Sequence, residues 1–286
     1  MTDMCNFKCR GCRRAVIGVT QSNEITVETV ERLLELYPEI GFFTVAGLGE
    51  PTLCPGFTEV VDYLKEKRKS VGIVTNGTNT APIISLKNRP DSISISLYGH
   101  DQSSYEKNCG VGLFEKVTSN FRILRERFGS VGFSYILTKD GYEDLEKVLE
   151  LTDKLEPGFL DLVNYLAYDP DDEEETDRII LLEDGDIIDF ITRQCSGRDY
   201  LRAMPVYVDP KEPIHRCRSY LYKINLDGAG NIGGCQRQVP PEEFYGNIYE
   251  DDNPFESPEM NRLRDLQRNC LRAHEECRFC FGDWGP

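Results

Sequence analysis

The sequence predicts an α/β fold, in which a partial (β/α)6 TIM-type barrel is followed by a small cysteine-rich α+β domain. Three observations carry this prediction. Strand-like apolar stretches alternate with apolar positions at helical spacing over the first two thirds of the chain. Glycines and polar side chains follow the predicted strands. Beyond residue 205 the pattern changes to short strands, turns and cysteines. We therefore expect two domains, residues 1–205 and 206–286.

The alternation begins at Thr26, which suits a helix N-cap, and the helix that follows ends at Pro38. Strands joined by helices form right-handed βαβ units around a parallel sheet, and such barrels carry their chemistry at the carboxyl ends of the strands. The acidic run 169–177 is expected to be a solvated loop or linker, and 179–202 is partly helical in character. The expected strands are 41–46, 71–75, 92–97, 131–137 and 159–166, and the expected helices include 57–67, 81–87, 113–128 and 143–155.

Charge and composition narrow the classes of function. The chain has 286 residues, enough for a full core, and its 33 basic and 49 acidic side chains give a formal charge of −16. Such a surface repels phosphate backbones, so we expect no nucleic-acid partner and favour a small-molecule or peptide substrate. Without a secretory signal or a membrane-length apolar run, the protein is expected to be cytoplasmic and not membrane-bound. Its eleven cysteines are then ligands or free thiols rather than disulfides.

Cys5, Cys9 and Cys12 form a Cys-x3-Cys-x2-Cys loop near the N-terminus. Gaps this short let a turning loop direct several sulfurs at one metal centre. Thiolates select iron–sulfur clusters, zinc or cuprous ion. Because a cubane cluster normally takes four thiolates, three neighbouring ones leave either a distant fourth ligand or one iron open to substrate. A zinc site is the alternative.

This loop resembles the signature of the radical SAM enzymes. The resemblance implies that Cys5, Cys9 and Cys12 hold a [4Fe-4S] cluster whose open iron chelates S-adenosylmethionine. An external electron donor such as flavodoxin or ferredoxin would reduce the cluster, and the resulting 5′-deoxyadenosyl radical would abstract hydrogen from a substrate carbon. Only four residues precede Cys5. The strand that usually delivers this loop is therefore missing, and either the start is truncated or the barrel opens unusually.

Gly47, Gly49 and Glu50 follow a predicted buried strand, in the segment Gly-Leu-Gly-Glu-Pro. Glycines let a ligand approach the backbone, and a carboxylate suits an ammonium group. The segment resembles the glycine–glycine–glutamate motif that holds the methionine amino group in radical SAM enzymes. We therefore expect these residues to bind the cofactor, with an ordinary strand-to-helix turn as the alternative.

Further cofactor contacts are expected at the next strand ends. Asn76 lies in a turn that resembles one lining the cofactor pocket of the family, and Ser94 and Ser96 lie where the family places ribose contacts. Ordinary turn chemistry is an equally open alternative for each residue. The family usually carries an aromatic residue just before the third cysteine, near adenine. Here that position is Gly11, so we expect Phe7 to make the contact.

The C-terminal part offers four further thiols. Cys217 and Cys235 flank a predicted hairpin, and Cys277 and Cys280 form a two-residue knuckle. The pattern Cys217-x12-Gly230-x4-Cys235 followed by the pair resembles SPASM, the auxiliary-cluster extension of radical SAM enzymes, in its short twitch form. The resemblance implies a second, fully ligated [4Fe-4S] cluster. A structural zinc site would use the same ligands.

Other candidates are single residues. Cys270 is a spare ligand for the second centre, while Cys54, Cys109 and Cys195 are read as buried hydrophobes. A sharper hypothesis makes Cys109 or Cys54 a hydrogen donor to a substrate radical. His100, beside Asp101 on the expected active face, is a candidate base.

Together these features predict a radical SAM oxidoreductase or isomerase. We expect it to abstract hydrogen from a small polar substrate, of aminocyclitol or sugar type, and to give dehydrogenation or epimerisation. The auxiliary cluster would accept the electron in a dehydrogenation. One alternative is a peptide maturase that forms thioether, carbon–carbon or epimerised products. From another class, the alternative is a non-catalytic zinc or iron–sulfur module.

Overall fold

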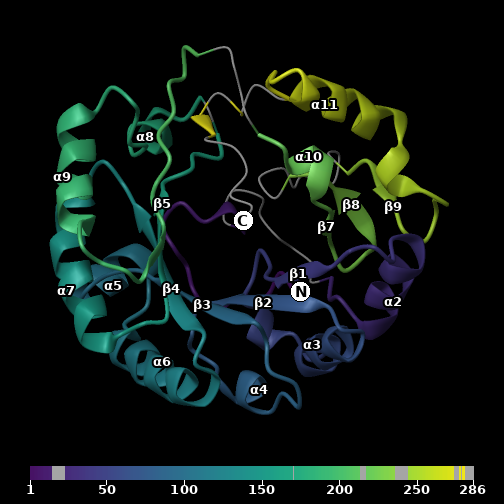
Figure 1. The fold of residues 1–286 in the computed structure, drawn as a ribbon, viewed down its shortest axis with the longest axis horizontal. Helices are drawn as coiled ribbons and strands as arrows, with labels where there is room; N and C mark the ends of the chain where they lie inside the picture. The colour runs from purple at the N-terminus through teal and green to yellow at the C-terminus, as the bar shows by residue number, and fades with distance from the viewer. Residues whose placement is uncertain are drawn as a thin grey trace.

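The computed structural model describes residues 1–14, 23–169, 171–212, 217–235, 244–273, 277 and 279–280. Its centre is a six-stranded sheet in the order β1 to β6, with every neighbouring pair parallel. Figure 1 shows the curved sheet with helices along its outer rim. The predicted fold class, a partial parallel barrel, is confirmed. The strands are β1 Phe42–Val45, β2 Ser70–Thr75, β3 Ser92–Leu97, β4 Val131–Leu137, β5 Leu160–Asn164 and β6 Leu201–Ala203.

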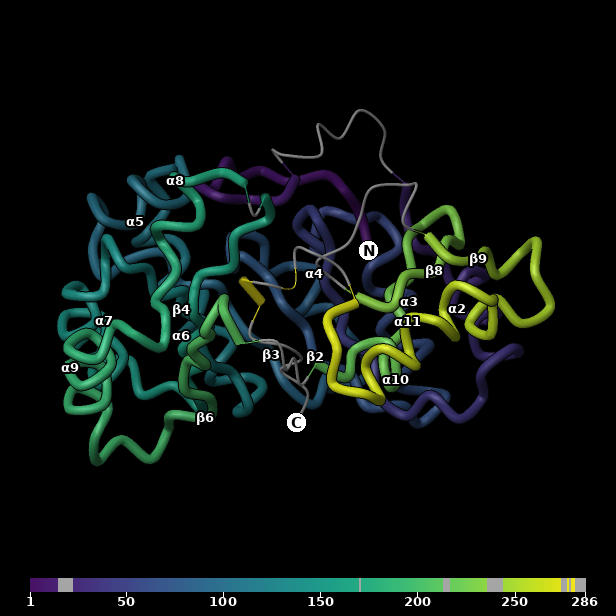
Figure 2. Tube along the Cα trace, turned by 90° about the horizontal axis from the view of Figure 1, so that it is seen from above, coloured from purple at the N-terminus to yellow at the C-terminus, as the bar shows by residue number. Residues whose placement is uncertain are grey.

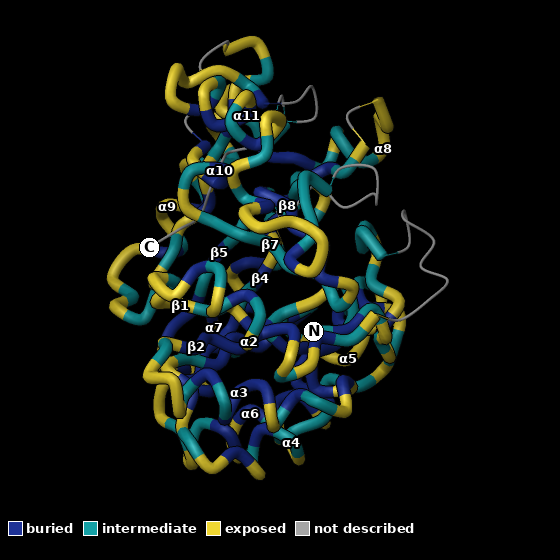
Figure 3. The backbone as a smooth tube through the Cα atoms, turned by 90° about the vertical axis from the view of Figure 1, so that its right-hand side faces the viewer, coloured by how far each residue is buried: buried dark blue, intermediate teal, exposed yellow. Residues whose placement is uncertain are grey.

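The helices cover the outside of this sheet with amphipathic faces. In the longest of them, Val117, Phe121 and Leu124 are fully buried, and the Phe121 ring stacks on Phe133 of β4 with centroids 4.3 Å apart. Figure 3 shows the buried chain concentrated around the sheet. The barrel helices are α2 Val27–Leu36, α3 Phe57–Glu66, α4 Ala81–Ile84, α5 Gln102–Cys109, α6 Phe114–Phe128, α7 Leu145–Leu155, α8 Glu173–Thr176 and α9 Gly185–Cys195, with 3-10 turns η1 Pro51–Leu53 and η2 Tyr142–Asp144.

Several local predictions need correction. The helix expected over 81–87 is the single turn α4, and α5 was not predicted. The acidic run 169–177 is not only a loop, since it contains α8, whose N-cap is Asp172. The partly helical region 179–202 yields α9 and then the short strand β6. Thr26 is the N-cap of α2 as expected, in a capping box with Thr29.

The described residues of the C-terminal part add the antiparallel sheet β7-β8-β9 and the helices α10 and α11. It packs on α2, because Ile232 and Ile248 share a buried cluster with Leu33 and Tyr37. Figures 1 and 2 both show α2 beside β9. We keep a boundary near residue 205 as a proposal. The elements are α10 Ser219–Tyr222, β7 Asn225–Leu226, β8 Asn231–Gly233, β9 Gly246–Asn247, η4 Pro254–Glu256 and α11 Pro258–Arg268. Among the described residues, no helix has the length and apolar character to cross a membrane.

Candidate active site

The loop that carries the first three cysteines is held by the end of α5. The Lys8 amide donates to the Cys109 carbonyl at 3.1 Å, and the Arg10 amide donates to the Asn108 carbonyl at 2.9 Å. The Asn108 side chain donates in turn to the backbone oxygen of Tyr98, which follows β3. A helix that sequence reasoning missed therefore fixes the middle of the cysteine loop against the barrel.

The three thiols of this loop are half-buried neighbours. The Cys12 amide donates to the Cys9 carbonyl at 3.2 Å, which closes the turn between them. Burial raises the pKa of Cys9 to about 12, and negative charge at Cys12 and Cys5 adds to the shift. Burial also raises the pKa of Cys5. In the described part of the chain, no three histidine, cysteine, aspartate or glutamate side chains converge on a single-ion site.

Gly47 and Gly49 are contacted by the chain's own N-terminal residues. The Gly49 amide donates to the Thr2 carbonyl at 3.0 Å, and the Glu50 amide donates to the Met4 carbonyl at 2.7 Å. A Cβ atom at Gly49 would lie 2.6 Å from the Met4 carbonyl carbon, and one at Gly47 would lie 2.8 Å from the Thr2 oxygen. The sequence interpretation expected a ligand to lie against these two glycines. In the structure the backbone of Thr2 and Met4 lies there.

Glu50 is only 2% exposed, and its carboxylate is used inside the protein. Oε1 accepts from the Thr52 amide at 3.1 Å, the Thr52 hydroxyl at 2.7 Å and the Thr75 hydroxyl at 2.6 Å, while Oε2 accepts from the Asn76 amide at 2.6 Å. Glu50 therefore joins η1 to the end of β2. The sequence interpretation, a carboxylate turned towards a ligand ammonium, did not include these internal donors.

Asn76 belongs to a closed ring of hydrogen bonds with Asn6 and Thr78. Its Nδ2 donates to Asn6 Oδ1 at 2.8 Å, Asn6 Nδ2 donates to Thr78 Oγ1 at 3.0 Å, and Thr78 Oγ1 donates to Asn76 Oδ1 at 2.7 Å. The ring ties the cysteine loop to the β2 end. Sequence reasoning missed Asn6, because nothing in its spacing separates it from other loop residues.

Ser94 and Ser96 lie on β3 as expected, Ser94 being buried and Ser96 half-buried. Phe7, the expected adenine contact, lies inside the protein in this structure. Its side chain is 4% exposed and meets Tyr98 and Tyr105 edge-on, with centroids 5.7 and 6.3 Å away. The ring therefore contributes to the core of the barrel.

Cys54 and Cys109 are also inside the core, at 3% and 0% exposure. Each sulfur lies within hydrogen-bonding distance of a backbone carbonyl, and burial raises the pKa of both thiols. Their burial argues against contact with a bound substrate. His100 follows β3 and is half-buried, with Nε2 3.4 Å from Asp101 and Nδ1 4.0 Å from Asp144. It remains a candidate base on the expected face.

The second cysteine group comprises Cys217, Cys235, Cys277 and Cys280, of which Cys217 is buried and the others are half-buried. The Cys280 amide donates to the Cys277 carbonyl at 3.1 Å, which forms the expected knuckle. Burial raises the pKa of Tyr220, and charge at Cys235 and Cys277 adds to the shift, so both thiols lie near this ring. Cys270 is exposed, beyond the end of α11.

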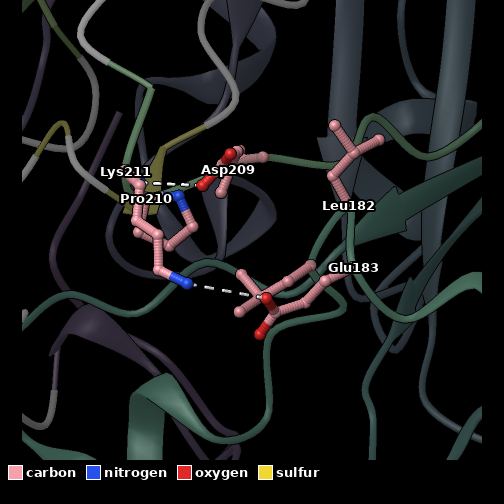
Figure 4. Close-up of a pocket in the computed structure, with 7 residues that line it drawn as sticks. Leu182, Glu183, Asp209, Pro210 and Lys211 are labelled. Atoms are coloured by element: carbon pink, nitrogen blue, oxygen red, sulfur yellow. Dashed lines mark hydrogen bonds and ion pairs between the residues drawn. The ribbon is translucent and has the colours of Figure 1, made fainter.

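A pocket lies where Leu181 pairs with Val208 in a parallel bridge, and Leu181 also packs against the buried cluster that Phe279 contacts. Figure 4 shows Lys211 reaching towards Glu183, an ion pair of 3.8 Å between exposed side chains. The pocket is lined by Leu181, Leu182, Glu183, Val208, Asp209, Pro210 and Lys211. None of the predicted site residues is among them, so we assign it no role.

Known proteins resemble this chain in sequence and in fold. The radical SAM superfamily matches residues 1–152, which include the first cysteine group and Glu50. The AdoMet-dependent heme synthase of Methanosarcina barkeri is 26% identical over 161 residues, covering 54% of this chain and 46% of that protein. The chain thus matches less than half of this relative's length.

Two solved structures share the fold over nearly the whole chain. Streptococcus suis SuiB bound to precursor peptide SuiA gives a TM-score of 0.75 at 16% identity, covering 99% of this chain and 70% of that one. The enzyme anSMEcpe with bound AdoMet and Kp18Cys peptide gives 0.71 at 18% identity, covering 98% and 86%. The likeness therefore extends through the C-terminal part.

Proposed function

We propose, from the premise that this chain belongs to the radical SAM superfamily, that Cys5, Cys9 and Cys12 hold the cluster at which S-adenosylmethionine is cleaved. The family uses a [4Fe-4S] cluster and S-adenosylmethionine. One observation carries the assignment: three neighbouring thiols share one loop, which hydrogen bonds attach to α5 and to the β2 end.

The donor chemistry fits such a cluster. Thiolates are the ligands that select iron–sulfur clusters, and a bound metal deprotonates the thiols that coordinate it. When bound, the cluster supplies the electron for reductive cleavage of S-adenosylmethionine. An external donor such as flavodoxin or ferredoxin would provide it.

The cofactor pocket is proposed to include Ser94 and Ser96 of β3, next to the Gly47–Glu50 loop and the Asn76 turn. In this proposal Glu50 holds η1 against the end of β2, and Asn76 holds the cysteine loop there through Asn6. Ser94 lies level with Gly132 of β4, and Ser96 lies level with Ser134. Because Ser94 and Ser96 are two residues apart on one strand, their side chains lie on the same face of the sheet.

Anaerobic reconstitution tests the cluster assignment. The variant with Cys5, Cys9 and Cys12 all changed to alanine should lose one cluster's iron and form no 5′-deoxyadenosine with dithionite and S-adenosylmethionine. Cys195→Ala is the control, since this thiol lies in α9, belongs to neither cysteine group and should leave both quantities unchanged. Unchanged iron or product in the triple variant would reject the assignment, and zinc alone in the wild type would favour the non-catalytic module.

The second group is proposed to hold an auxiliary [4Fe-4S] cluster on Cys217, Cys235, Cys277 and Cys280. Such a cluster would accept the second electron in a dehydrogenation. Epimerisation instead needs a hydrogen donor, and the two thiols considered for it, Cys54 and Cys109, are buried in the core. Dehydrogenation is therefore the form of the reaction that we propose.

For the substrate we propose a small polar molecule of aminocyclitol or sugar type. The acidic side chains of Asp101 and Asp144 lie beyond the ends of β3 and β4, and the whole chain carries a formal charge of −16. This surface suits an amine-bearing substrate. His100, between Asp101 and Asp144, is the proposed base.

A peptide substrate is the second candidate. It is favoured by the fold likeness to SuiB, solved with precursor peptide SuiA, and to anSMEcpe, solved with Kp18Cys peptide. Reactions in heavy water with a panel of amino sugars and peptides separate the candidates. A dehydrogenated amino sugar supports the first substrate class and a modified peptide the second, while deuterium bound to carbon would show hydrogen return and reject dehydrogenation.

A further inference from the structure

Gly11 is the residue before Cys12. The Tyr165 side chain occupies the space where a side chain at position 11 would lie. Gly11 has φ +70, and a Cβ atom there would lie 2.9 and 3.0 Å from two ring carbons of Tyr165 and closer still to its hydroxyl oxygen. Tyr165 directly follows β5, and its amide donates to the Leu137 carbonyl at 2.8 Å. The ring is 4% exposed. A side chain from the carboxyl end of β5 therefore occupies the volume that residue 11 leaves empty.

The same ring is connected to Arg10 through two charged side chains. The Arg178 guanidinium lies over the Tyr165 ring, 4.2 Å from its centroid. Its Nε is 3.6 Å from Asp140 Oδ1, and Asp140 Oδ2 is 3.1 Å from Arg10 Nη1. Arg178 is only 11% exposed at its side chain, whereas Asp140 and Arg10 are about two fifths exposed. The contacts thus run from Arg10 through Asp140 and Arg178 to the Tyr165 ring, which lies against Gly11. Arg10 and Gly11 are the two residues between Cys9 and Cys12.

A residue of the second cysteine group packs against the cluster that contains Tyr165. Phe279, between Cys277 and Cys280, packs against a buried cluster made of Tyr165, Ala167 and Ile179. In Figure 1 the short yellow pieces of residues 277 and 279–280 accordingly lie towards α8, apart from α11. One hydrophobic cluster thus contacts the first cysteine loop on one side and the knuckle of the second group on the other.

We propose that Tyr165, supported by Arg178 and Asp140, is the positioning residue that couples the two cysteine centres. Its ring meets Gly11 directly, supports Arg10 through Arg178 and Asp140, and belongs to the cluster against which Phe279 packs. The coupling role rests on the proposed function, because it takes both cysteine groups to be cluster sites. The contact between Tyr165 and Gly11 does not, and it can be tested without iron.

A double-mutant cycle on the iron-free chain tests that contact. Gly11→Ala should lower the melting temperature by several degrees, because the new methyl group meets the Tyr165 ring and because φ is positive. In the Tyr165→Ala background the same change should cost less than half as much. Gly129→Ala is the matched control, since Gly129 has φ +78 with nothing within 4 Å of its Cβ position. Its cost should be the same in both backgrounds. Equal losses for Gly11→Ala in the two backgrounds would overturn the contact.

Iron release from the reconstituted protein tests the coupling. Each centre is followed alone, with the other group's cysteines changed to alanine, by the rate of transfer to a chelator and by the electron paramagnetic resonance spectrum of the reduced cluster. Tyr165→Ala should speed release roughly tenfold from both centres, the scale seen when residues that orient metal ligands are lost. Tyr165→Phe, which keeps the ring, should restore the wild-type rate and spectrum.

Tyr200→Ala is the control that distinguishes loss of the coupling from a general loss of stability. Tyr200 is half-buried, hydrogen-bonds to Thr152 and belongs to neither cysteine group. This variant should leave both release rates unchanged. Acceleration at the first centre alone, or equal acceleration by Tyr165→Ala and Tyr200→Ala, would overturn the coupling. If the wild type binds no iron, the proposed function fails, while the iron-free cycle still decides the Tyr165–Gly11 contact.

Discussion

Replacing Glu50 by glutamine tests whether its carboxylate braces the site. The substitution replaces one acceptor oxygen with an NH2 donor. The NH2 group is expected at the Oε2 position, because there it removes one hydrogen bond, from the Asn76 amide, whereas at Oε1 it would remove three. A hydrogen bond to a charged group contributes about 1.5–3 kcal/mol, and three further bonds to Oε1 lose their charge. We expect the free energy of unfolding to fall by about 3 kcal/mol. For a chain of this size that is a drop of roughly 6–12 °C in melting temperature.

The assay is thermal unfolding of the iron-free chain, followed by circular dichroism, with iron retention and S-adenosylmethionine binding measured after reconstitution. Asp62→Asn is the control. Asp62 is 5% exposed, and Oδ1 accepts from the amides of Lys87 and Asn88 at 3.0 Å each. It should destabilise the fold to a similar degree without touching the cysteine loop. Only Glu50→Gln should also weaken iron retention and cofactor binding.

One result would refute this reasoning. If Glu50→Gln unfolds at the wild-type temperature but binds S-adenosylmethionine more weakly, the carboxylate faces the ligand and does not brace the loops. The sequence interpretation of Glu50 as the ammonium acceptor would then hold. Equal weakening of cofactor binding by Asp62→Asn would show that the binding assay reports general destabilisation.

Three further outcomes follow from the structure. Asn6→Leu removes two hydrogen bonds of the Asn6–Asn76–Thr78 ring and should speed iron release to a chelator roughly tenfold; an unchanged rate would show that the ring does not hold the loop. Gly49→Ala should lower the melting temperature more than Gly185→Ala, because only the first Cβ meets backbone atoms. A hydrogen bond from Arg198 holds the pKa of Asp153 below its usual value, so this group's stabilisation is complete above the unfolded pKa of about 3.9 and is lost as pH falls through the folded value. Urea unfolding of wild type and Asp153→Asn should therefore differ at pH 7 and converge in acid, and a constant difference would contradict the assignment.

Most of the barrel could be predicted from local pattern, and the exceptions have local reasons. The strands β1, β3, β4 and β5 lie within the predicted segments, and β2 begins one residue before its segment, because all five are rich in the β-branched and apolar residues that favour strands. β6 has three residues and no buried one, so it gives no such run. α5 is mostly polar, with Tyr105 and Cys109 as its buried residues. Its capping box, Asp101 with Ser104, was the available signal.

The site could be predicted only where spacing along the chain carries the information. Cysteines three and four residues apart identify one loop, whatever the rest of the fold does. The partners of Glu50 and Phe7 depend on how separate strand ends meet. Glu50 receives bonds from Thr75 and Asn76 on the neighbouring strand end, and Phe7 meets Tyr98 at the end of β3. These pairings follow from the closure of the sheet, which no single segment encodes.

Gly11 and Gly49 show why the same residue type can carry different consequences. At Gly49 the obstacle to a side chain is backbone, near the Met4 carbonyl, and no substitution at Met4 removes it. At Gly11 the obstacle is the Tyr165 ring, which a substitution can remove. The Gly49 side of the site is thus held by main chain, whereas the segment between Cys9 and Cys12 is held by a side chain whose cluster also receives Phe279.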